Sequence, residues 1–219
     1  MTVDLRLYAL IDPAVAGGRS LGAIAQCIAG SATLVQLRDK HGSTRQLVEE
    51  ARELTIVLAP LNIPLLINDR VDVALAAEAD GVHIGQDDMS PADARLLLGR
   101  TAIIGLSVKT VEQAKAAPLD LLDYVGIGGV YGTTSKDDAK EPIGLSGFSA
   151  VVQAIRARDP KFPICGIAGI NKSNAGDVIM QGADGVAVIS ALSLAADPTT
   201  AARDLLSEVD GALARRGRA

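Results

Sequence analysis

Short apolar runs alternate with longer amphipathic segments along the whole chain. The runs contain few alternating polar positions, which is typical of strands buried on both faces of a parallel sheet. They lie at Leu5–Ile11, Thr33–Leu37, Pro64–Ile67, Gly81–Ile84, Ala102–Leu106, Tyr124–Ile127, Phe162–Ile167 and Gly185–Ile189. The segments between them repeat apolar residues at helical spacing and are predicted as helices: Leu21–Ala29, Thr44–Ala59, Val71–Ala77, Pro91–Leu98, Val111–Ala116, Gly147–Arg158, Lys172–Gln181 and Pro198–Leu213.

Strict alternation of strands and helices, with a repeat of about 25 residues, predicts a single-domain α/β protein with a (β/α)8 TIM-barrel fold. Ser90–Pro91 and Asp197–Pro198 each place a capping residue and a first-turn proline where a helix is expected. A doubly wound open sheet is the alternative. It favours fewer units and a glycine-rich turn after the first strand, and "IDPAVAGGRS" lacks the GxGxxG spacing. One domain over residues 1–219 is therefore predicted, with residues 214–219 as a frayed tail.

Composition narrows the function classes. The chain has 219 residues with 48% hydrophobic content, which is ample for one core. A net charge of −5, 2% aromatic residues and the absence of Trp argue against nucleic acid or an anionic membrane as partner. No signal peptide or membrane-spanning run is apparent, so a cytoplasmic protein is expected. Cys27 and Cys165 are interpreted as reduced and buried. The oligomeric state stays open, and a homodimer is compatible with so apolar a small barrel.

Polar residues follow nearly every predicted strand. In a (β/α)8 barrel the active site is built at the carboxyl ends of the strands. Seven such clusters would meet on one rim, in the sequences "QLRDK", "INDR", "GQDD", "GLS", "VYGTTSKDDAKEPIGL", "IAGIN" and "VIS". Their convergence predicts a functional site there.

Two carboxylates at neighbouring strand ends suit a magnesium ion. Asp69 follows the third strand and Asp88 the fourth. Mg²⁺ takes one or two protein carboxylates and completes its octahedron with water and substrate phosphates. One ion per subunit is expected, and the sequence does not distinguish Mg²⁺ from Mn²⁺. The alternatives are that Asp69 caps the next helix and that Asp88 is a solvated loop residue. Asp87 is the less suitable ligand of its pair.

Cationic residues at the end of the second strand indicate a diphosphate. Arg38 and Lys40 share one face of the extended chain with Gln36. Positive groups beside a metal would cover the phosphate oxygens that the ion does not reach. The alternative is a solvated basic strand end paired with Asp39.

Small residues at the ends of the seventh and eighth strands indicate a phosphate site. Backbone N–H groups near Gly169, Ile189 and Ser190 are the candidates, because the loops after these strands commonly bind phosphate in TIM barrels. A glycine turn made only for tight packing is the alternative. The connection Tyr131–Leu145 is long for this fold and is interpreted as a lid that would deliver Lys136, with an inert surface loop as its alternative.

Neither histidine is interpreted as catalytic. His83 lies inside an apolar strand, which favours a hydrogen-bonded interior residue, and His41 is expected to be exposed. No Ser-His-Asp, Cys-His or zinc-ligand spacing is present.

The set of strand-end motifs resembles one family. "VQLRDK", "INDR", "GVHIGQDD", "GLS", "TTSK", "GIAGIN" and "GADGVAVIS" fall in the order and at the spacing of thiamine phosphate synthase, also called thiamine-phosphate pyrophosphorylase. The resemblance covers about Leu7 to Leu205. It implies a transferase of thiamine biosynthesis that joins 4-amino-2-methyl-5-pyrimidinylmethyl diphosphate to 4-methyl-5-(2-phosphonooxyethyl)thiazole, giving thiamine phosphate and pyrophosphate.

The resemblance also implies residue roles. Magnesium would be held by Asp69 and Asp88. The pyrimidine diphosphate would be bound by Gln36, Arg38, Lys40, Asn68, Ser107 and Lys136, and among these the catalytic residues would be Arg38, Lys40, Ser107 and Lys136. The thiazole phosphate would be bound by Thr133, Thr134, Ser135, Gly169, Ile189 and Ser190.

The chain departs from the family pattern at three positions. Ser135 stands where Thr is typical, Gly129 where Pro is common, and Ala168 in place of the first glycine of a Gly-Gly pair. The methyl group of Ala168 is expected to affect the affinity for the thiazole phosphate rather than the reaction itself.

Three other functions remain to be separated from this one. They are a related thiazole tautomerase, a non-catalytic paralogue that binds thiamine phosphate, and an unrelated sugar-phosphate isomerase. The first two would not need the diphosphate-binding residues, and the third would need a Glu or His base at a strand end, which is not found.

Overall fold

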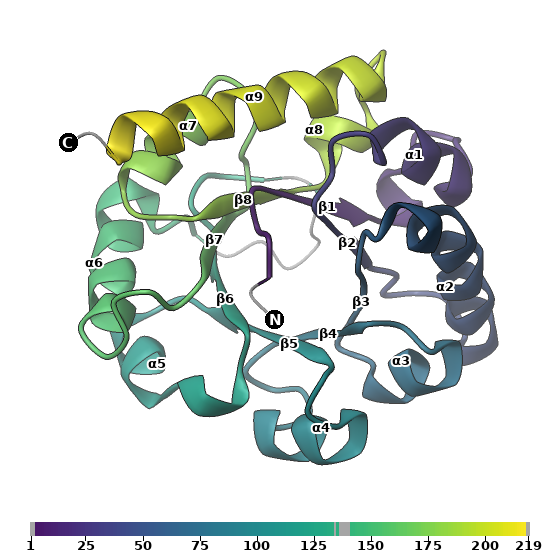
Figure 1. The fold of residues 1–219 in the computed structure, drawn as a ribbon, viewed down its shortest axis with the longest axis horizontal. Coiled ribbons are helices and arrows are strands. Elements are labelled where there is room, and N and C mark those ends of the chain that lie inside the picture. Colours follow the sequence, from purple (N-terminus) through teal and green to yellow (C-terminus); the bar gives the residue numbers. More distant parts are fainter. Residues whose placement is uncertain (1–2, 134, 136–140, 218–219) are drawn as a thin grey trace.

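Eight parallel strands close into a barrel in chain order (Figure 1). The structure is a computed structural model that describes residues 3–133, 135 and 141–217. Each strand pairs with the next, and β8 pairs with β1 through Tyr8 and Ala187. The strands are β1 Leu7–Ile11, β2 Leu34–Leu37, β3 Leu65–Asn68, β4 Gly81–Ile84, β5 Ile103–Val108, β6 Tyr124–Gly128, β7 Ile164–Ile167 and β8 Gly185–Val188. The predicted single-domain TIM barrel is confirmed.

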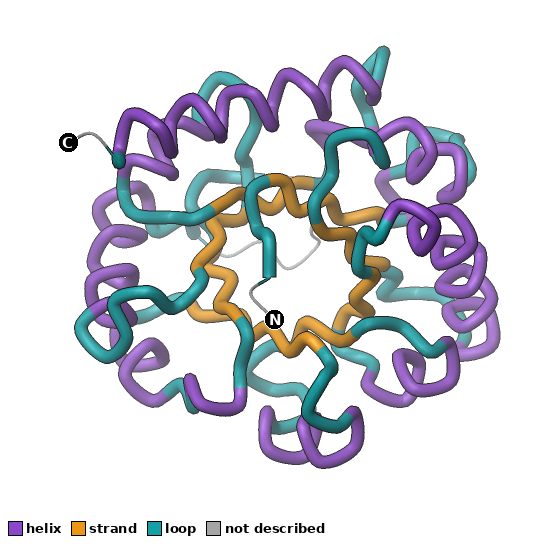
Figure 2. The backbone as a smooth tube through the Cα atoms, viewed as in Figure 1, coloured by secondary structure: helices purple, strands orange, loops and turns teal. Residues whose placement is uncertain are grey.

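Helices form an outer ring around the strands (Figure 2). They are α1 Leu21–Ile28, α2 Thr44–Leu58, α3 Val71–Ala77, α4 Pro91–Leu98, α5 Val111–Ala116, α6 Gly144–Arg156, α7 Ala175–Met180, α8 Ser190–Ser193 and α9 Pro198–Arg216, with 3-10 turns at Pro13–Val15, Ala59–Leu61 and Leu119–Leu121. Ser90 and Asp197 cap α4 and α9 with their side chains, as their positions before prolines predict. The short α8 was not predicted.

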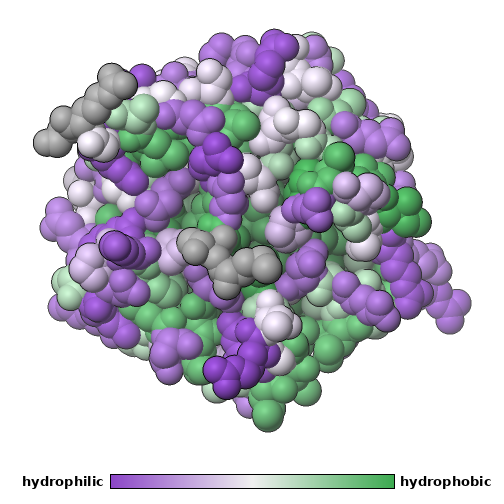
Figure 3. Space-filling view, in the orientation of Figure 1, coloured by the Kyte–Doolittle hydropathy of each residue, from purple (hydrophilic) through white to green (hydrophobic). Residues whose placement is uncertain are grey.

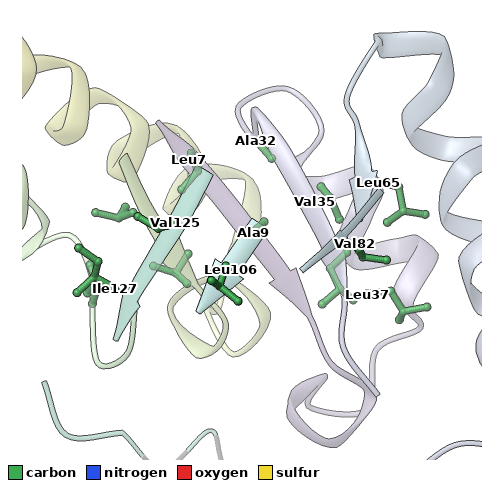
Figure 4. Packing of buried hydrophobic residues seen from close by; sticks show 14 of the residues in the cluster. Leu7, Ala9, Ala32, Val35, Leu37, Leu65, Val82, Leu106, Val125 and Ile127 are labelled. Carbon is green, nitrogen blue, oxygen red and sulfur yellow. The ribbon is translucent and has the colours of Figure 1, made fainter. Parts of the chain in front are cut away.

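The core has two layers because successive strand residues point to opposite sides of the barrel wall. Leu7, Ala9 and Ile11 face the helices in a large aliphatic cluster, part of which is shown in Figure 4. Tyr8 and Leu10 face the barrel interior, where they join a smaller cluster with Leu34, Leu66, Tyr124, Cys165 and Ala187. Cys165 is buried and both cysteines are free, but Cys27 is only half-buried.

The amino ends of the strands form the face seen in Figure 3, where apolar side chains gather over α4. Leu96 and Leu97 on that helix are 81% and 50% exposed. A cavity of about 1020 Å³ lies at this end, lined by residues that precede β2 to β5, such as Thr33 and Asp80.

The last helix extends further than the sequence pattern indicates. Arg216 donates to the carbonyl oxygen of Ile179 at 2.9 Å and pairs with Asp184 at 3.2 Å. Residues 214–216 belong to α9, which differs from the frayed tail expected there, and residues 218–219 lie outside the described part. Within the described ranges, no helix is both long and apolar enough to cross a membrane.

Candidate active site

The two predicted metal-binding carboxylates lie side by side at the carboxyl ends of β3 and β4. Asp69 Oδ2 pairs with Lys40 Nζ at 2.5 Å. Asp88 Oδ2 accepts the Gly85 N–H at 2.7 Å. Burial raises the pKa of Asp88, and the neighbouring Asp69 carboxylate raises it further. Two like charges brought together with one lysine make a site that favours a further cation.

Asp69 is held in an unusual backbone conformation. Its φ is +62°, and its N–H donates to the carbonyl oxygen of His83 on β4 at 2.8 Å. A left-handed non-glycine residue costs about 1–3 kcal/mol and is common at functional sites. Asp69 does not cap the following helix, because α3 has Arg70 at its N-cap and no side-chain cap. The carboxylate is thus directed to the rim rather than used to begin a helix.

The carboxylate pair fits a magnesium ion better than a metal held by protein alone. Over the described residues, no group of three or more His, Cys, Asp and Glu side chains could enclose a metal. Mg²⁺ needs no such cage, since it binds through one or two carboxylates and keeps water or phosphate oxygens as its other ligands.

Arg38 is buried and paired with a residue that sequence reasoning missed. Its guanidinium donates to the carboxylate of Asp12, which lies directly after β1 and is 2% exposed. The other Asp12 oxygen accepts the Ala14 N–H at 2.9 Å. Asp12 therefore orients Arg38 at the rim. The sequence signal for this role is the position of Asp12 directly after the first apolar run.

Gln36 and Ser107 are joined through the barrel interior. Gln36 donates to the Tyr8 hydroxyl, Tyr8 contacts the Tyr124 hydroxyl at 2.8 Å, and Tyr124 contacts His83 Nδ1 at 2.8 Å. His83 Nε2 contacts Ser107 Oγ at 2.8 Å. The prediction that His83 is a hydrogen-bonded interior histidine is confirmed. Gln36 Oε1 is buried and has no hydrogen-bond partner in the described structure.

The predicted phosphate residues surround a small hollow at the ends of β7 and β8. Its lining includes Thr133, Ser135, Gly169, Ile189 and Ser190. Ile189 is the N-cap of α8, which has no side-chain cap among the described residues. A short extra helix whose N-terminus meets the loops after strands seven and eight is the usual phosphate site of TIM barrels.

Ala168 lines the same hollow in a strained conformation. Its φ is +84°, where an L-residue with a Cβ is unfavourable. A Cβ on Gly129 would lie 3.3 Å from the Ala168 methyl group. Two of the family departures are therefore neighbours in space, with the methyl group of Ala168 on the side where a Gly129 side chain would lie.

Of the remaining predicted site residues, the structure describes Asn68 but not Thr134 or Lys136. Asn68 ends β3 opposite His83, on the same rim as Asp69. Thr134 and Lys136 lie outside the described residues. The structure thus brings the metal, diphosphate and phosphate candidates of the described chain to one end of the barrel, opposite the 1020 Å³ cavity.

Comparison with known proteins identifies the family. The family model described as thiamine monophosphate synthase matches residues 7–192. The thiamine-phosphate synthase of Chloroflexus aurantiacus is 49% identical over 93% of this chain and 92% of its own length. The chain belongs to the thiamine monophosphate synthase family.

Two further relatives of the family agree. The thiamine-phosphate synthase of Agrobacterium fabrum is 46% identical over 98% of both chains. The solved thiamine phosphate pyrophosphorylase of Pyrococcus furiosus superposes with a TM-score of 0.83 and 36% identity over 96% of this chain and 98% of its own. The predicted family and its enzyme class, a transferase of thiamine biosynthesis, are confirmed.

Proposed function

We propose that the enzyme joins 4-amino-2-methyl-5-pyrimidinylmethyl diphosphate to 4-methyl-5-(2-phosphonooxyethyl)thiazole, with one Mg²⁺ per subunit. The observation that carries this proposal is the facing pair Asp69 and Asp88 beside Lys40. In a closed eight-stranded barrel, β3 and β4 lie across from β7 and β8. A diphosphate site and a monophosphate site on opposite sides of one rim suit two phosphorylated substrates.

The diphosphate would bind on the β2–β4 side. Arg38 presents a guanidinium that Asp12 holds in place, and Lys40 presents an ammonium group. Asp69 and Asp88 would hold Mg²⁺, which when bound neutralises phosphate oxygens of the leaving group. Ser107 and Lys136 are proposed as further contacts to the diphosphate. The buried acceptor Gln36 Oε1 matches the exocyclic amino group of the pyrimidine, which is a hydrogen-bond donor.

The reaction needs charge neutralisation and alignment rather than proton removal. The bond between the methylene carbon and the diphosphate oxygen breaks, and its electron pair leaves with pyrophosphate. The aminopyrimidine spreads the positive charge that remains, and the thiazole nitrogen uses its lone pair to form the new carbon–nitrogen bond. That nitrogen carries no proton, so no general base is required, and His83 is engaged in the barrel interior.

The thiazole phosphate would be anchored on the β7–β8 side. Backbone N–H groups near Gly169 and Ser190, with the hydroxyl groups of Thr133, Thr134 and Ser135, are the proposed contacts. Ser135 N donates to Thr133 Oγ1 at 3.1 Å, which shapes the described start of this loop. Anchoring the phosphate there would direct the thiazole ring across the rim toward the methylene carbon.

One assay separates this function from the alternatives. The purified protein is mixed with both substrates and Mg²⁺, and pyrophosphate and thiamine phosphate are measured together. We expect both products in equal amounts, with neither formed when one substrate or the metal is left out. A thiazole tautomerase or a non-catalytic binding paralogue would release no pyrophosphate.

A further inference from the structure

The barrel interior holds a polar chain that the reaction itself does not use. Tyr8 and Tyr124 are each at most 1% exposed and His83 is 8% exposed. Their rings pack on one another, with the two tyrosines edge to face at 5.7 Å and His83 stacked on Tyr124 at 5.5 Å between centroids. Two glycines make the room: a Cβ on Gly105 would lie 2.1 Å from Tyr124 Cζ, and one on Gly126 would lie 3.0 Å from His83 Cε1.

The two tyrosines remain protonated, so each hydroxyl group has one proton to donate. Burial raises the pKa of both Tyr8 and Tyr124. A neutral imidazole has one donor and one acceptor nitrogen. Only two proton orders along such a chain give every buried hydroxyl proton an acceptor, and the side chain at one end decides which of them occurs.

In the observed order the Gln36 amide N–H donates to Tyr8. If the buried Tyr8 proton is to have an acceptor, Tyr8 donates to Tyr124 and Tyr124 donates to His83 Nδ1, so that His83 carries its proton on Nε2 and donates it to Ser107 Oγ. Ser107 accepts this hydrogen bond and keeps its own proton for a group outside the chain. Gln36 is left with a buried carbonyl oxygen that accepts nothing from the described protein.

The reverse order would present the opposite chemistry. If Tyr8 donated to the Gln36 carbonyl, the amide N–H groups would be left without partners and Ser107 would donate its proton to His83 Nε2. The serine could then only accept hydrogen bonds, which repels an anion. The observed order instead offers an acceptor at Gln36 and a donor at Ser107, which complement an amino group and a phosphate oxygen.

We propose that Tyr8, Tyr124 and His83 are positioning residues that fix the hydrogen-bonding polarity of the substrate site, holding Gln36 as an acceptor and Ser107 as a donor. The inference rests on the proposed function for the identity of the ligand, an aminopyrimidine carrying a diphosphate. It adds that the two ends of this ligand are recognised by one connected chain. A change at the centre of the chain therefore weakens recognition at both ends.

The tautomer of His83 tests the proton order in the free protein. The chain has two histidines, so a ¹⁵N-histidine-labelled sample gives two ring systems, and His41→Asn assigns them. Two-bond ¹H–¹⁵N correlation spectra distinguish the tautomers. We expect the ring proton of His83 on Nε2; a proton on Nδ1 would overturn the proposal whether or not the enzyme makes thiamine phosphate.

Removing one hydroxyl tests the consequence for binding. Tyr124→Phe keeps the ring over Gly105 and cuts the chain, so we expect His83 to lose its single tautomer. The KM for the pyrimidine diphosphate should rise about tenfold, the effect of losing one well-placed hydrogen bond to a charged ligand. The KM for the thiazole phosphate should not change, because that substrate binds across the rim.

Cys165→Ala is the matched control. Cys165 is buried in the same interior cluster, and its replacement perturbs packing while keeping every hydroxyl of the chain. It should leave both the tautomer and the two KM values unchanged. Equal rises of both KM values in Tyr124→Phe, or an unchanged KM for the diphosphate, would overturn the proposal, and Tyr8→Phe provides the same test if Tyr124→Phe does not fold.

Discussion

Aspartates occur at both ends of the barrel, but their surroundings differ. At the amino ends, Asp80, Asp123 and Asp184 each precede a strand and accept the N–H of the first or second residue of a neighbouring strand at 2.8–2.9 Å. Asp123 also pairs with Arg95, and Asp184 with Arg156 and Arg216. At the carboxyl ends, Asp69 and Asp88 face each other with Lys40 as their cation.

The comparison separates carboxylates that stabilise the fold from those available for chemistry. At the amino ends the negative charge is matched by backbone donors and guanidinium groups within the chain. At the carboxyl ends the Asp69 carboxylate and burial raise the pKa of Asp88, a cost of ionisation that a bound divalent cation would relieve. The same residue type thus closes the barrel at one end and prepares a binding site at the other.

The largest effect is expected at the carboxyl ends, from Asp69→Asn. Asn tolerates the left-handed backbone at this position better than Ala, so the fold should be retained. Loss of the metal-binding charge should lower kcat/KM by roughly 10³-fold, which corresponds to about 4 kcal/mol. Steady-state release of pyrophosphate measures this, with Asp87→Asn as the control. Near-normal turnover in Asp69→Asn would remove the metal assignment.

At the amino ends we expect loss of stability without loss of rate. Asp184→Ala leaves the buried Ile164 N–H and two arginines without their acceptor, which should cost about 2–4 kcal/mol. Urea unfolding gives the free energy, and kcat should not change in the folded fraction. Asp204→Ala removes an exposed carboxylate that pairs with Lys172 and should cost far less stability than Asp184→Ala. If the two variants lost equal stability, the structural role of Asp184 would be disproved.

Ala168→Gly tests strain beside the phosphate hollow. Glycine adopts a φ of +84° without a steric penalty, which favours the folded variant. Its larger conformational entropy in the unfolded chain offsets part of this gain, so the net increase in unfolding free energy should be about 0.5–1 kcal/mol. The KM for the thiazole phosphate should be unchanged or lower. Ala9→Gly, in a regular strand, should instead destabilise. A clear rise of that KM in Ala168→Gly would show that the methyl group aids binding.

The smallest effect concerns the pH dependence of the metal-free protein. The pKa of Asp88 is raised in the folded state from an ordinary value of 3.8. Its contribution to stability is therefore present below about pH 4 and is lost as the pH rises through the folded-state pKa. Asp88→Asn should stabilise the metal-free protein at pH 7 by roughly 0.5 kcal/mol, because solvent screens the exposed Asp88 carboxylate.

Thermal unfolding without divalent ions at pH 3 and pH 7 measures this gain. The difference between Asp88→Asn and the wild type should disappear at pH 3, where the Asp88 carboxyl with its raised pKa is protonated. A gain of equal size at both pH values would contradict the repulsion between Asp69 and Asp88.

Much of the fold followed from the sequence, because doubly buried strands form continuous apolar runs and prolines mark two helix starts. The rim was predictable for the same reason: strand order in a barrel brings distant strand ends together. The short α8 was missed because four residues carry no helical period. The pairing of Asp12 with Arg38 depends on the register between strands, which the sequence does not indicate. Tyr8 and Tyr124 lie within apolar runs, so the sequence pattern predicts them only as core residues.

The left-handed residues were also beyond sequence reasoning. Asp69 and Ala168 adopt positive φ because their neighbours hold them there. The residue type alone does not predict this conformation at either position. That Ala168 lies beside Gly129 is evident only in the assembled barrel. Local composition thus predicts which elements form, whereas strain and cross-strand partners depend on the assembled barrel.

Binding of the Mn²⁺–pyrophosphate complex tests the central claim most directly. Electron paramagnetic resonance follows the loss of the free-complex signal as protein is added, for the wild type, Asp69→Asn and the control Asp87→Asn. We predict one complex per chain in the wild type and the control, displaced by excess Mg²⁺, and at least tenfold weaker binding in Asp69→Asn. Equal affinity in all three proteins would contradict a metal site formed by Asp69 and Asp88.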